Sequence, residues 1–273
     1  MASKYFDSAN LRLRLISAAI LMPVVLLAVY LGGLAYGALA TCVVVVGLYE
    51  WLRLISPALN ARTVGIACAL MIFLMTVGLL FSISCGLIAA IVATLILFLL
   101  ALRDGDRRSL WTAFGIPYLG GSGLALLYLR FVPDIGTALV FYLLVVVWST
   151  DSGAFIAGRL IGGRKLAPII SPSKTWAGLF GGMVLALILG YLAASLMQAH
   201  YPLWTVVLSP LLAVVAQMGD LFESAFKRRS GAKESGDIIP GHGGILDRID
   251  GLVFAGIFLA LFEALIGVHF AWW

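Results

Sequence analysis

The acidic residues that could take part in chemistry gather late in the chain, at the edges of long apolar runs. Asp220 and Glu223 lie three residues apart at the end of one run, and Asp247 and Asp250 lie three apart at the start of the next. Side chains at this spacing share one face of a helix. Asp151 follows a third apolar run. Because carboxylates beside so much apolar sequence are costly to bury, these five acids are the first candidates for function.

The segment between the two acidic pairs is basic and rich in glycine. Its basic residues and glycines, with one histidine, include Lys227, Arg228, Arg229, Lys233, Gly241, His242, Gly243, Gly244 and Arg248. Glycine removes side-chain bulk and lets backbone N–H groups face an anion, and a helix start near Asp247 offers further free N–H groups. Carboxylates bind a hard cation such as Mg²⁺, whereas Lys and Arg bind phosphate oxygens. The pattern therefore indicates a site for a magnesium-bound polyphosphate.

The composition determines which elements can position these residues. The chain has 273 residues, of which 62% are hydrophobic and 11% are charged. Soluble domains carry about 25% charged residues, and disordered chains are poor in apolar residues, so both classes are excluded. The apolar residues form long runs and do not alternate over short segments, which favours helices over a membrane barrel. We therefore expect an all-α polytopic membrane protein.

The apolar runs predict about nine transmembrane helices in a single integral membrane domain, 1–273. The expected spans are 15–31, 36–52, 64–82, 84–102, 113–129, 137–158, 176–197, 203–222 and 249–271. Residues 1–110 would contain the first four helices. Residues 111–273 would contain helices five to nine and the two polar segments that carry the candidate site, 150–178 and 220–250.

The basic residues predict how the chain is oriented in the membrane. All the Lys- and Arg-bearing connections fall on one side of a nine-span arrangement, and only Arg130 falls on the other. The positive-inside rule makes that side cytosolic. The N-terminus is then cytosolic and the C-terminus lies on the opposite side, with its last two tryptophans at the membrane interface. A basic membrane face suits anionic lipids or substrates, whereas nucleic acid would need a folded basic domain that this chain lacks.

Four acidic residues outside this group receive other interpretations. Glu50 lies three residues before Arg53 and is expected to form a helix-end pair with it. Asp104 and Asp106, beside two arginines, are expected to lie in a solvated turn. Glu263, inside the last span, is either a buried helix–helix contact or part of a lipid path.

Longer motifs give a specific resemblance. Ser224 to Arg228, then Lys233, then the run from Pro240 to Asp250 resemble the signature of the phosphatidate cytidylyltransferases, also called CDP-diacylglycerol synthases. Two shorter blocks, Thr150 to Phe155 and Ser171 to Gly178, resemble other blocks of that family. The match covers about 27 contiguous residues near the C-terminus, and the composition fits the family along the whole chain.

The chain departs from the family pattern at three positions. Glu234 stands where Asp is usual, Ser173 where Lys is common, and Ala177 where Glu is usual. The first exchange keeps a carboxylate that is one methylene longer. The last removes an acid, which puts a catalytic role at that position in doubt for this chain.

The resemblance implies transfer of CMP from CTP to phosphatidic acid, which yields CDP-diacylglycerol and pyrophosphate for phospholipid biosynthesis. It further implies Mg²⁺ together with a monovalent cation such as K⁺, a homodimer among membrane lipids, and a place in the bacterial inner membrane with the active site facing the cytosol. Metal ions and cationic side chains would bring two polyanions together and stabilise the leaving pyrophosphate.

Within that reaction, each candidate residue receives an expected role. The metal ligands would be Asp220 and Asp247, with Asp250 and Glu223 in or near the coordination shell. The phosphate-holding residues would be Lys227, Arg228, Lys233, Arg248, Lys174 and Thr175. The triphosphate would be contacted by Gly241, His242, Gly243 and Gly244, and Asp151 would assist from the same cavity.

Two other functions fit parts of the pattern. A secondary transporter of an anionic substrate could use the acids as a proton relay, but it predicts broken helices and polar residues near the membrane centre. A CTP-dependent lipid kinase would transfer the γ-phosphoryl group. Attachment of CMP to the lipid separates a cytidylyltransferase from both.

Overall fold

The computed structural model describes residues 8–238, 243–267 and 273 of the chain. Its helices are α1 (Ser8–Leu31), α2 (Gly33–Ile55), α3 (Ala61–Leu80), α4 (Ile83–Arg103), α5 (Ser109–Gly115), α6 (Gly121–Phe131), α7 (Gly136–Leu160), α8 (Trp176–Leu196), α9 (Trp204–Arg229) and α10 (Leu246–Phe262). Two π-helices, η2 (Ile116–Gly120) and η3 (Glu263–Gly267), continue α5 and α10.

The all-α membrane class is confirmed. In the described part of the chain, eight helical segments are long and apolar enough to cross a membrane, and α5, η2 and α6 together form one of them. The described apolar part of α1, Ala19–Leu31, is shorter than these eight. A ninth span therefore stays a prediction.

The polar segment 150–178 contains a short β-hairpin. Strands β1 (Lys165–Ala167) and β2 (Ser171–Thr175) pair antiparallel, with Lys165 opposite Thr175. Strand β2 leads directly into α8, and the Thr175 hydroxyl accepts a hydrogen bond from Gly178 N at 3.0 Å as the helix N-cap. The hairpin thereby fixes the position of Lys174 at the end of the bundle.

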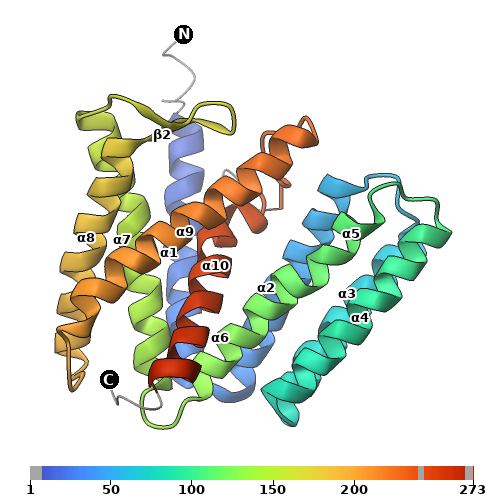
Figure 1. Cartoon of the computed structure of the whole chain (residues 1–273), viewed down its shortest axis with the longest axis horizontal. Helices are drawn as coiled ribbons and strands as arrows, with labels where there is room; N and C mark the ends of the chain where they lie inside the picture. The colour runs from blue at the N-terminus through green and yellow to red at the C-terminus, as the bar shows by residue number, and fades with distance from the viewer. Residues whose placement is uncertain (1–7, 239–242, 268–272) are drawn as a thin grey trace.

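The helices form an elongated bundle in which the basic connections share one end (Figure 1). The helix pair α3–α4 lies at one side and the helix pair α7–α8 at the other. Helices α2, α6 and α10 lie between the two pairs, and α9 crosses the bundle at a slant. The hairpin β1–β2, the end of α9 and the α2–α3 and α4–α5 connections all lie at the top in Figure 1. The polar segments 150–178 and 220–250 therefore reach the same end of the molecule.

Arg130, the one basic residue expected on the opposite side, has a structural partner. Its Nε donates to Val29 O at 2.8 Å and its Nη2 to Tyr30 O at 3.4 Å. These carbonyls belong to the last turn of α1, where a cation satisfies unpaired carbonyls and complements the helix dipole. Arg130 thus caps a helix, which explains its place outside the basic end.

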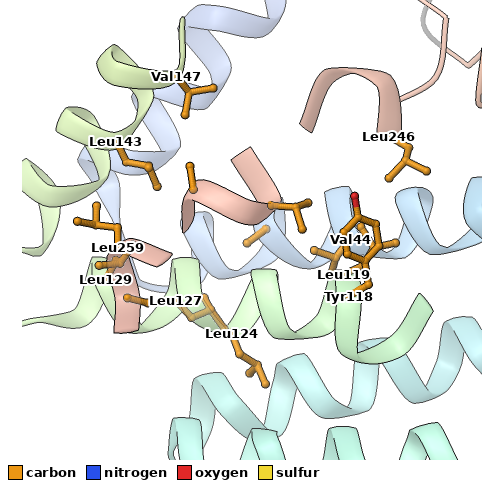
Figure 2. Close-up of a cluster of buried hydrophobic side chains, with 14 of the residues drawn as sticks. Val44, Tyr118, Leu119, Leu124, Leu127, Leu129, Leu143, Val147, Leu246 and Leu259 are labelled. Carbon is orange, nitrogen blue, oxygen red and sulfur yellow. The ribbon is translucent and has the colours of Figure 1, made fainter. Parts of the chain in front are cut away.

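The core joins the N-terminal helices to α9 and α10. Buried side chains of α2, η2, α6, α7 and α10 meet along the centre of the bundle (Figure 2). Near the basic end, the Trp51 indole, fully buried, lies 5.2 Å from the Tyr118 ring and 4.9 Å from the Phe226 ring. Aromatic contacts at such distances favour tilted packing and add to burial. This cluster fixes α9 against α2 and η2.

The C-terminal residue Trp273 is buried against other helices, and its place at the membrane interface stays a prediction. The ring centroid lies 5.4 Å from that of Tyr142, and its carbonyl oxygen lies 3.0 Å from His200 Nδ1. Its predicted partner Trp272 lies outside the described residues.

Helices α7 and α8 touch through glycine. A Cβ at Gly153 would lie 2.5 Å from Gly181 O, and a Cβ at Gly181 would lie 2.2 Å from that of Ala157. Small residues let membrane helices approach so closely that backbones touch. This contact brings Asp151 on α7 toward the start of α8 and strand β2.

We expect Gly153→Val to separate α7 from α8, at a cost of about 1–3 kcal/mol for overpacking. A lower melting temperature and lower activity in detergent would record this loss. Gly65→Ala is the matched control, because a Cβ at Gly65 meets nothing within 4 Å. A Gly153→Val protein as stable as the Gly65→Ala control would contradict the packing role.

Candidate active site

One face of α9 supplies the centre of the site. Gln217, Asp220, Glu223 and Lys227 follow one another at three- and four-residue spacing. Residues so spaced stack along one side of a helix. Two lysines, one from β2 and one from α9 itself, divide the acidic residues into two clusters.

The first cluster is centred on Lys174. Its Nζ donates to Asp220 Oδ2 in a short ion pair and to Gln217 Oε1 at 3.0 Å. Asp151 of α7 interacts electrostatically with Asp220, Lys174 and Arg248. The predicted residues Asp151, Lys174 and Asp220 are therefore brought together from three separate elements.

A cavity of about 360 Å³ opens beside this cluster. Its walls come from α7, β2, α8 and α9, and its polar lining comprises Asp151, Arg159, Ser173, Lys174, Thr175, Gln217 and Asp220. The volume lies within the range of small-molecule sites. Arg159 and Gln217 had not been singled out from the sequence, because neither belongs to a charged cluster there.

The second cluster is centred on Lys227 and is more deeply buried. Lys227 Nζ lies 2.8 Å from Glu223 Oε2 and 2.6 Å from Asp247 Oδ1. Asp247 Oδ2 also accepts hydrogen bonds from Ser235 N and Gly244 N, each at 3.0 Å. Both oxygens of Asp247 therefore already have donors within the chain.

Asp250 lies between the two clusters. Its charge interacts with those of Asp220 and Glu223, and it lies beside the Glu223 carboxyl. The other oxygen of Glu223, Oε1, is buried and has no hydrogen-bond donor among the described residues. The Glu223 and Asp250 carboxyls lie within side-chain hydrogen-bond reach of each other, and two neighbouring carboxylates repel unless a proton or a cation lies between them. These oxygens can therefore contribute to a cation site.

The described residues do not form a complete metal cage on their own. No group of three or more His, Cys, Asp or Glu side chains converges in a metal-binding arrangement within 8–238 and 243–267. Mg²⁺ needs fewer protein ligands, because it commonly uses one or two carboxylates with water and substrate phosphates. Asp220 together with one neighbouring carboxylate would meet that need.

Tyr118 of η2 also faces this region. Its hydroxyl is buried without a hydrogen-bond partner among the described residues, and it interacts electrostatically with Glu223, Asp250 and Asp220. Tyr118 lies inside an apolar run, so the sequence does not indicate that it faces these carboxylates. π-Helical turns such as η2 are frequent at functional sites.

The glycine loop differs from its predicted form at the start of α10. That helix starts at Leu246, and its first backbone N–H groups already have acceptors: Gly244 N donates to Asp247, and Ile245 N and Leu246 N donate to Glu50. The expectation of free N–H groups at this helix start is therefore wrong. Gly243 has φ of 79°, a conformation that glycine adopts without strain.

The remaining predicted residues differ in their surroundings. Arg228, Lys233 and Arg248 are exposed, and Arg228 Nε donates to Ile170 O at 3.4 Å, which connects α9 to the hairpin. Thr175 lines the cavity but also caps α8. Gly241 and His242 lie outside the described residues, so their predicted triphosphate contacts stay predictions.

Glu50 does not form the predicted pair with Arg53. The Glu50 carboxylate is 2% exposed and binds the 235–246 segment, whereas Arg53 lies over the Tyr49 ring at 5.3 Å. Local sequence proximity suggested the pair, but backbone donors on a distant helix satisfy Glu50 better. This is the main site residue that the sequence did not reveal.

The predicted solvated turn at Asp104 and Asp106 is confirmed: the 104–108 connection is a turn in which Asp104 is exposed and Asp106 partly exposed, and both carboxylates also accept hydrogen bonds. Thr63 Oγ1 donates to Asp104 Oδ2 at 2.7 Å, and Ser56 Oγ donates to Asp106 Oδ2 at 2.8 Å. Both carboxylates hold neighbouring connections together at the basic end, because they supply acceptors for hydroxyls that are otherwise buried.

Comparison with known proteins identifies the family. A model of the cytidylyltransferase family matches residues 12–266. The phosphatidate cytidylyltransferase of Brucella suis biovar 1 (strain 1330) is 39% identical over 262 residues, which cover 94% of both chains. That of Haemophilus influenzae is 34% identical over 282 residues, covering 92% of this chain and 98% of the relative.

The chain belongs to the cytidylyltransferase family.

A third relative, the phosphatidate cytidylyltransferase of Bacillus subtilis, is 44% identical over 149 residues, about half of each chain. The family resemblance seen in the motifs is thereby confirmed. In this cytidylyltransferase, the motif residues Lys174, Asp220, Lys227 and Asp247 form the two ion-pair clusters.

We expect Lys227→Met to destabilise the protein by about 3–5 kcal/mol, because it leaves two buried carboxylates without their cation. Thermal unfolding in detergent measures the change. Adding Glu223→Gln to this variant should recover part of the stability. Lys233→Met, at an exposed position of the same segment, should change stability by less than about 0.5 kcal/mol. Equal stability of the two lysine variants would rule out the buried-cluster role.

Proposed function

We propose that this chain transfers CMP from CTP to the phosphate of phosphatidic acid, and that it makes CDP-diacylglycerol and pyrophosphate for phospholipid biosynthesis. The single observation that carries the proposal is the cavity beside Lys174 and Asp220. It has charged side chains in its wall, lies at the basic end of an apolar bundle, and is built from the family motifs. A lipid phosphate and a soluble nucleotide can both reach such a place.

The residues suit this reaction chemically. A phosphate oxygen of the lipid attacks the α-phosphorus of CTP, the new P–O bond forms, and the bond to the β-phosphate oxygen breaks. The lipid phosphate is already anionic and needs no strong base. The main barrier is repulsion between two polyanions, which Lys174, Lys227 and Arg159 reduce by placing positive charge at the site.

We propose Mg²⁺ as the cofactor, together with a monovalent cation such as K⁺. Asp220 and Asp247 would hold Mg²⁺, with Asp250 and Glu223 in or near the coordination shell. The metal would neutralise charge on the triphosphate and on the leaving pyrophosphate. The chain's own contribution is to keep these carboxylates at fixed positions through their lysine partners.

The orientation and assembly also stay proposals. The basic end of the bundle would face the cytosol of a bacterium, with the protein in its inner membrane, because Lys and Arg are retained on that side. CTP is then available where the cavity lies. We further propose a homodimer, which the family resemblance implies.

The decisive assay incubates purified protein with phosphatidate vesicles, Mg²⁺ and CTP labelled at the α-phosphate. We expect label in the lipid fraction and release of unlabelled pyrophosphate. The same assay with γ-labelled CTP should leave the lipid unlabelled. Lipid labelled from the γ-position would indicate a lipid kinase. Absence of label from both positions, with uptake of phosphate compounds into proteoliposomes, would indicate a transporter.

We expect Asp220→Asn and Asp247→Asn each to lower turnover per folded protein at least about 100-fold, or roughly 2.7 kcal/mol of transition-state stabilisation. Residues that act as a unit are non-additive, so the double variant should be little worse than either single variant. Activity is measured across a range of Mg²⁺ concentrations. Asp237→Asn, at an exposed position of the same segment, is the control and should keep full activity. Near-native turnover of both single variants at limiting Mg²⁺ would remove them from the site.

A further inference from the structure

A buried carboxylate from the N-terminal part of the chain reaches the segment that carries the catalytic acids. Glu50 of α2 is 2% exposed. Its Oε1 accepts a hydrogen bond from Ile245 N at 3.0 Å, and its Oε2 accepts hydrogen bonds from Leu246 N at 2.8 Å and Ser235 Oγ at 3.2 Å. All three donors are neutral, and they lie at least 185 residues away along the chain.

Glu50 takes the place of a missing helix cap. Ile245 occupies the N-cap position of α10, and its side chain makes no capping hydrogen bond. The first N–H groups of a helix need acceptors from elsewhere. Glu50 supplies acceptors for two N–H groups at this helix start, and its negative charge is favourable at the positive end of the helix dipole.

Gly236 and Gly244 pack closely against Glu50. A Cβ at Gly236 would lie 2.9 Å from Glu50 Oε1, and a Cβ at Gly244 would lie 2.6 Å from Oε2. Only glycine can pass the carboxylate at these distances. Gly236 and Gly244 therefore have a packing reason that does not involve nucleotide.

Glu50 and Asp247 hold the same short stretch. Ser235 donates its hydroxyl to Glu50 and its backbone N–H to Asp247. Gly244 packs on Glu50 and donates its N–H to Asp247. The remaining oxygen of Asp247 binds Lys227. Glu50 is therefore linked to Asp247 through Ser235 and Gly244, and Asp247 is bound directly to Lys227. A change in the position of Glu50 would be transmitted along these contacts.

We propose that Glu50 is a positioning residue of the active site, which fixes the start of α10 and so sets where Asp247 and Asp250 lie relative to α9. This proposal rests on the function proposed above. Glu50 itself touches neither nucleotide nor metal. The active site would then depend on α2 as well as on the C-terminal helices that carry the motifs.

A purely structural role makes different predictions. If Glu50 only stabilised the bundle, its loss would lower the amount of folded protein but leave the remaining enzyme unchanged. A positioning role changes the folded enzyme itself, in its KM for CTP, its Mg²⁺ requirement and the protection of the Ile245 and Leu246 amides.

The test compares Glu50→Gln with the native protein. Glutamine keeps the size but turns one acceptor into an NH₂ group that faces backbone N–H donors. We expect the CTP KM or the half-saturating Mg²⁺ concentration to rise at least about tenfold, with hydrogen exchange at the Ile245 and Leu246 amides at least about tenfold faster. Glu50→Asp, which keeps the charge but is shorter, should shift the same quantities less and serves where the glutamine variant does not fold.

Asp106→Asn is the matched control. Asp106 also accepts three hydrogen bonds, from Ser56 Oγ, Thr112 Oγ1 and Arg108 N, at the same end of the bundle. It has none to the 235–246 segment. Its loss should lower stability without changing the Mg²⁺ requirement or the exchange at Ile245 and Leu246.

Unchanged kinetic constants and unchanged exchange in a folded Glu50 variant would overturn the proposal, as would equal shifts in Asp106→Asn. The exchange measurement needs no substrate. If the native protein failed to transfer CMP, the function proposed above would fall, while exchange at Ile245 and Leu246 would still decide whether Glu50 holds the start of α10.

Discussion

A carboxylate among apolar helices stays charged only where a cation or several hydrogen-bond donors face it, and this requirement shapes the functional end of the molecule. Lys174 meets it for Asp220, and Lys227 meets it for Glu223 and Asp247. Glu50 meets it without any cation, through two backbone N–H groups and a hydroxyl. Each solution ties one element to another: β2 to α9, α9 to α10, and α2 to α10. The same contacts that make the acids tolerable therefore set their relative positions.

Packing prepares the elements for these contacts. The glycine contact between α7 and α8 brings Asp151 near the hairpin, and the aromatic cluster around Trp51 fixes α9 against α2. Neither contact includes a charged group. Small residues thus set the spacing between α7 and α8, and large aromatic residues set the spacing between α2 and α9. The polar clusters lie on helices whose separation these apolar contacts determine.

Much of this arrangement could be predicted from the chain, and the rest depended on contacts distant in sequence. Long apolar runs predict membrane helices, and the three-residue spacing of Asp220 with Glu223 correctly predicts a shared helix face. The pairing of Lys174 with Asp220 spans 46 residues and depends on the hairpin, which no periodicity indicates. Glu50 was assigned to its neighbour Arg53 because sequence shows only local partners. The sequence also predicts free N–H groups at the start of α10. It cannot show whether a side chain or a ligand accepts their hydrogen bonds, and in the structure Glu50 does so.

The π-helix η2 has a consequence for how this membrane span can change over evolution. A π turn closes each hydrogen bond over five residues where an α turn uses four, so the span holds one residue more than a continuous α-helix would. Removing that residue would turn everything on one side of η2 by about 100° relative to the other side. Tyr118 would then leave the carboxylates, or α6 would turn away from α2 and α10. Substitution of a side chain leaves the length of the segment from Ser109 to Phe131 unchanged. Insertion or deletion of one residue would break the packing contacts on one side of the π turn.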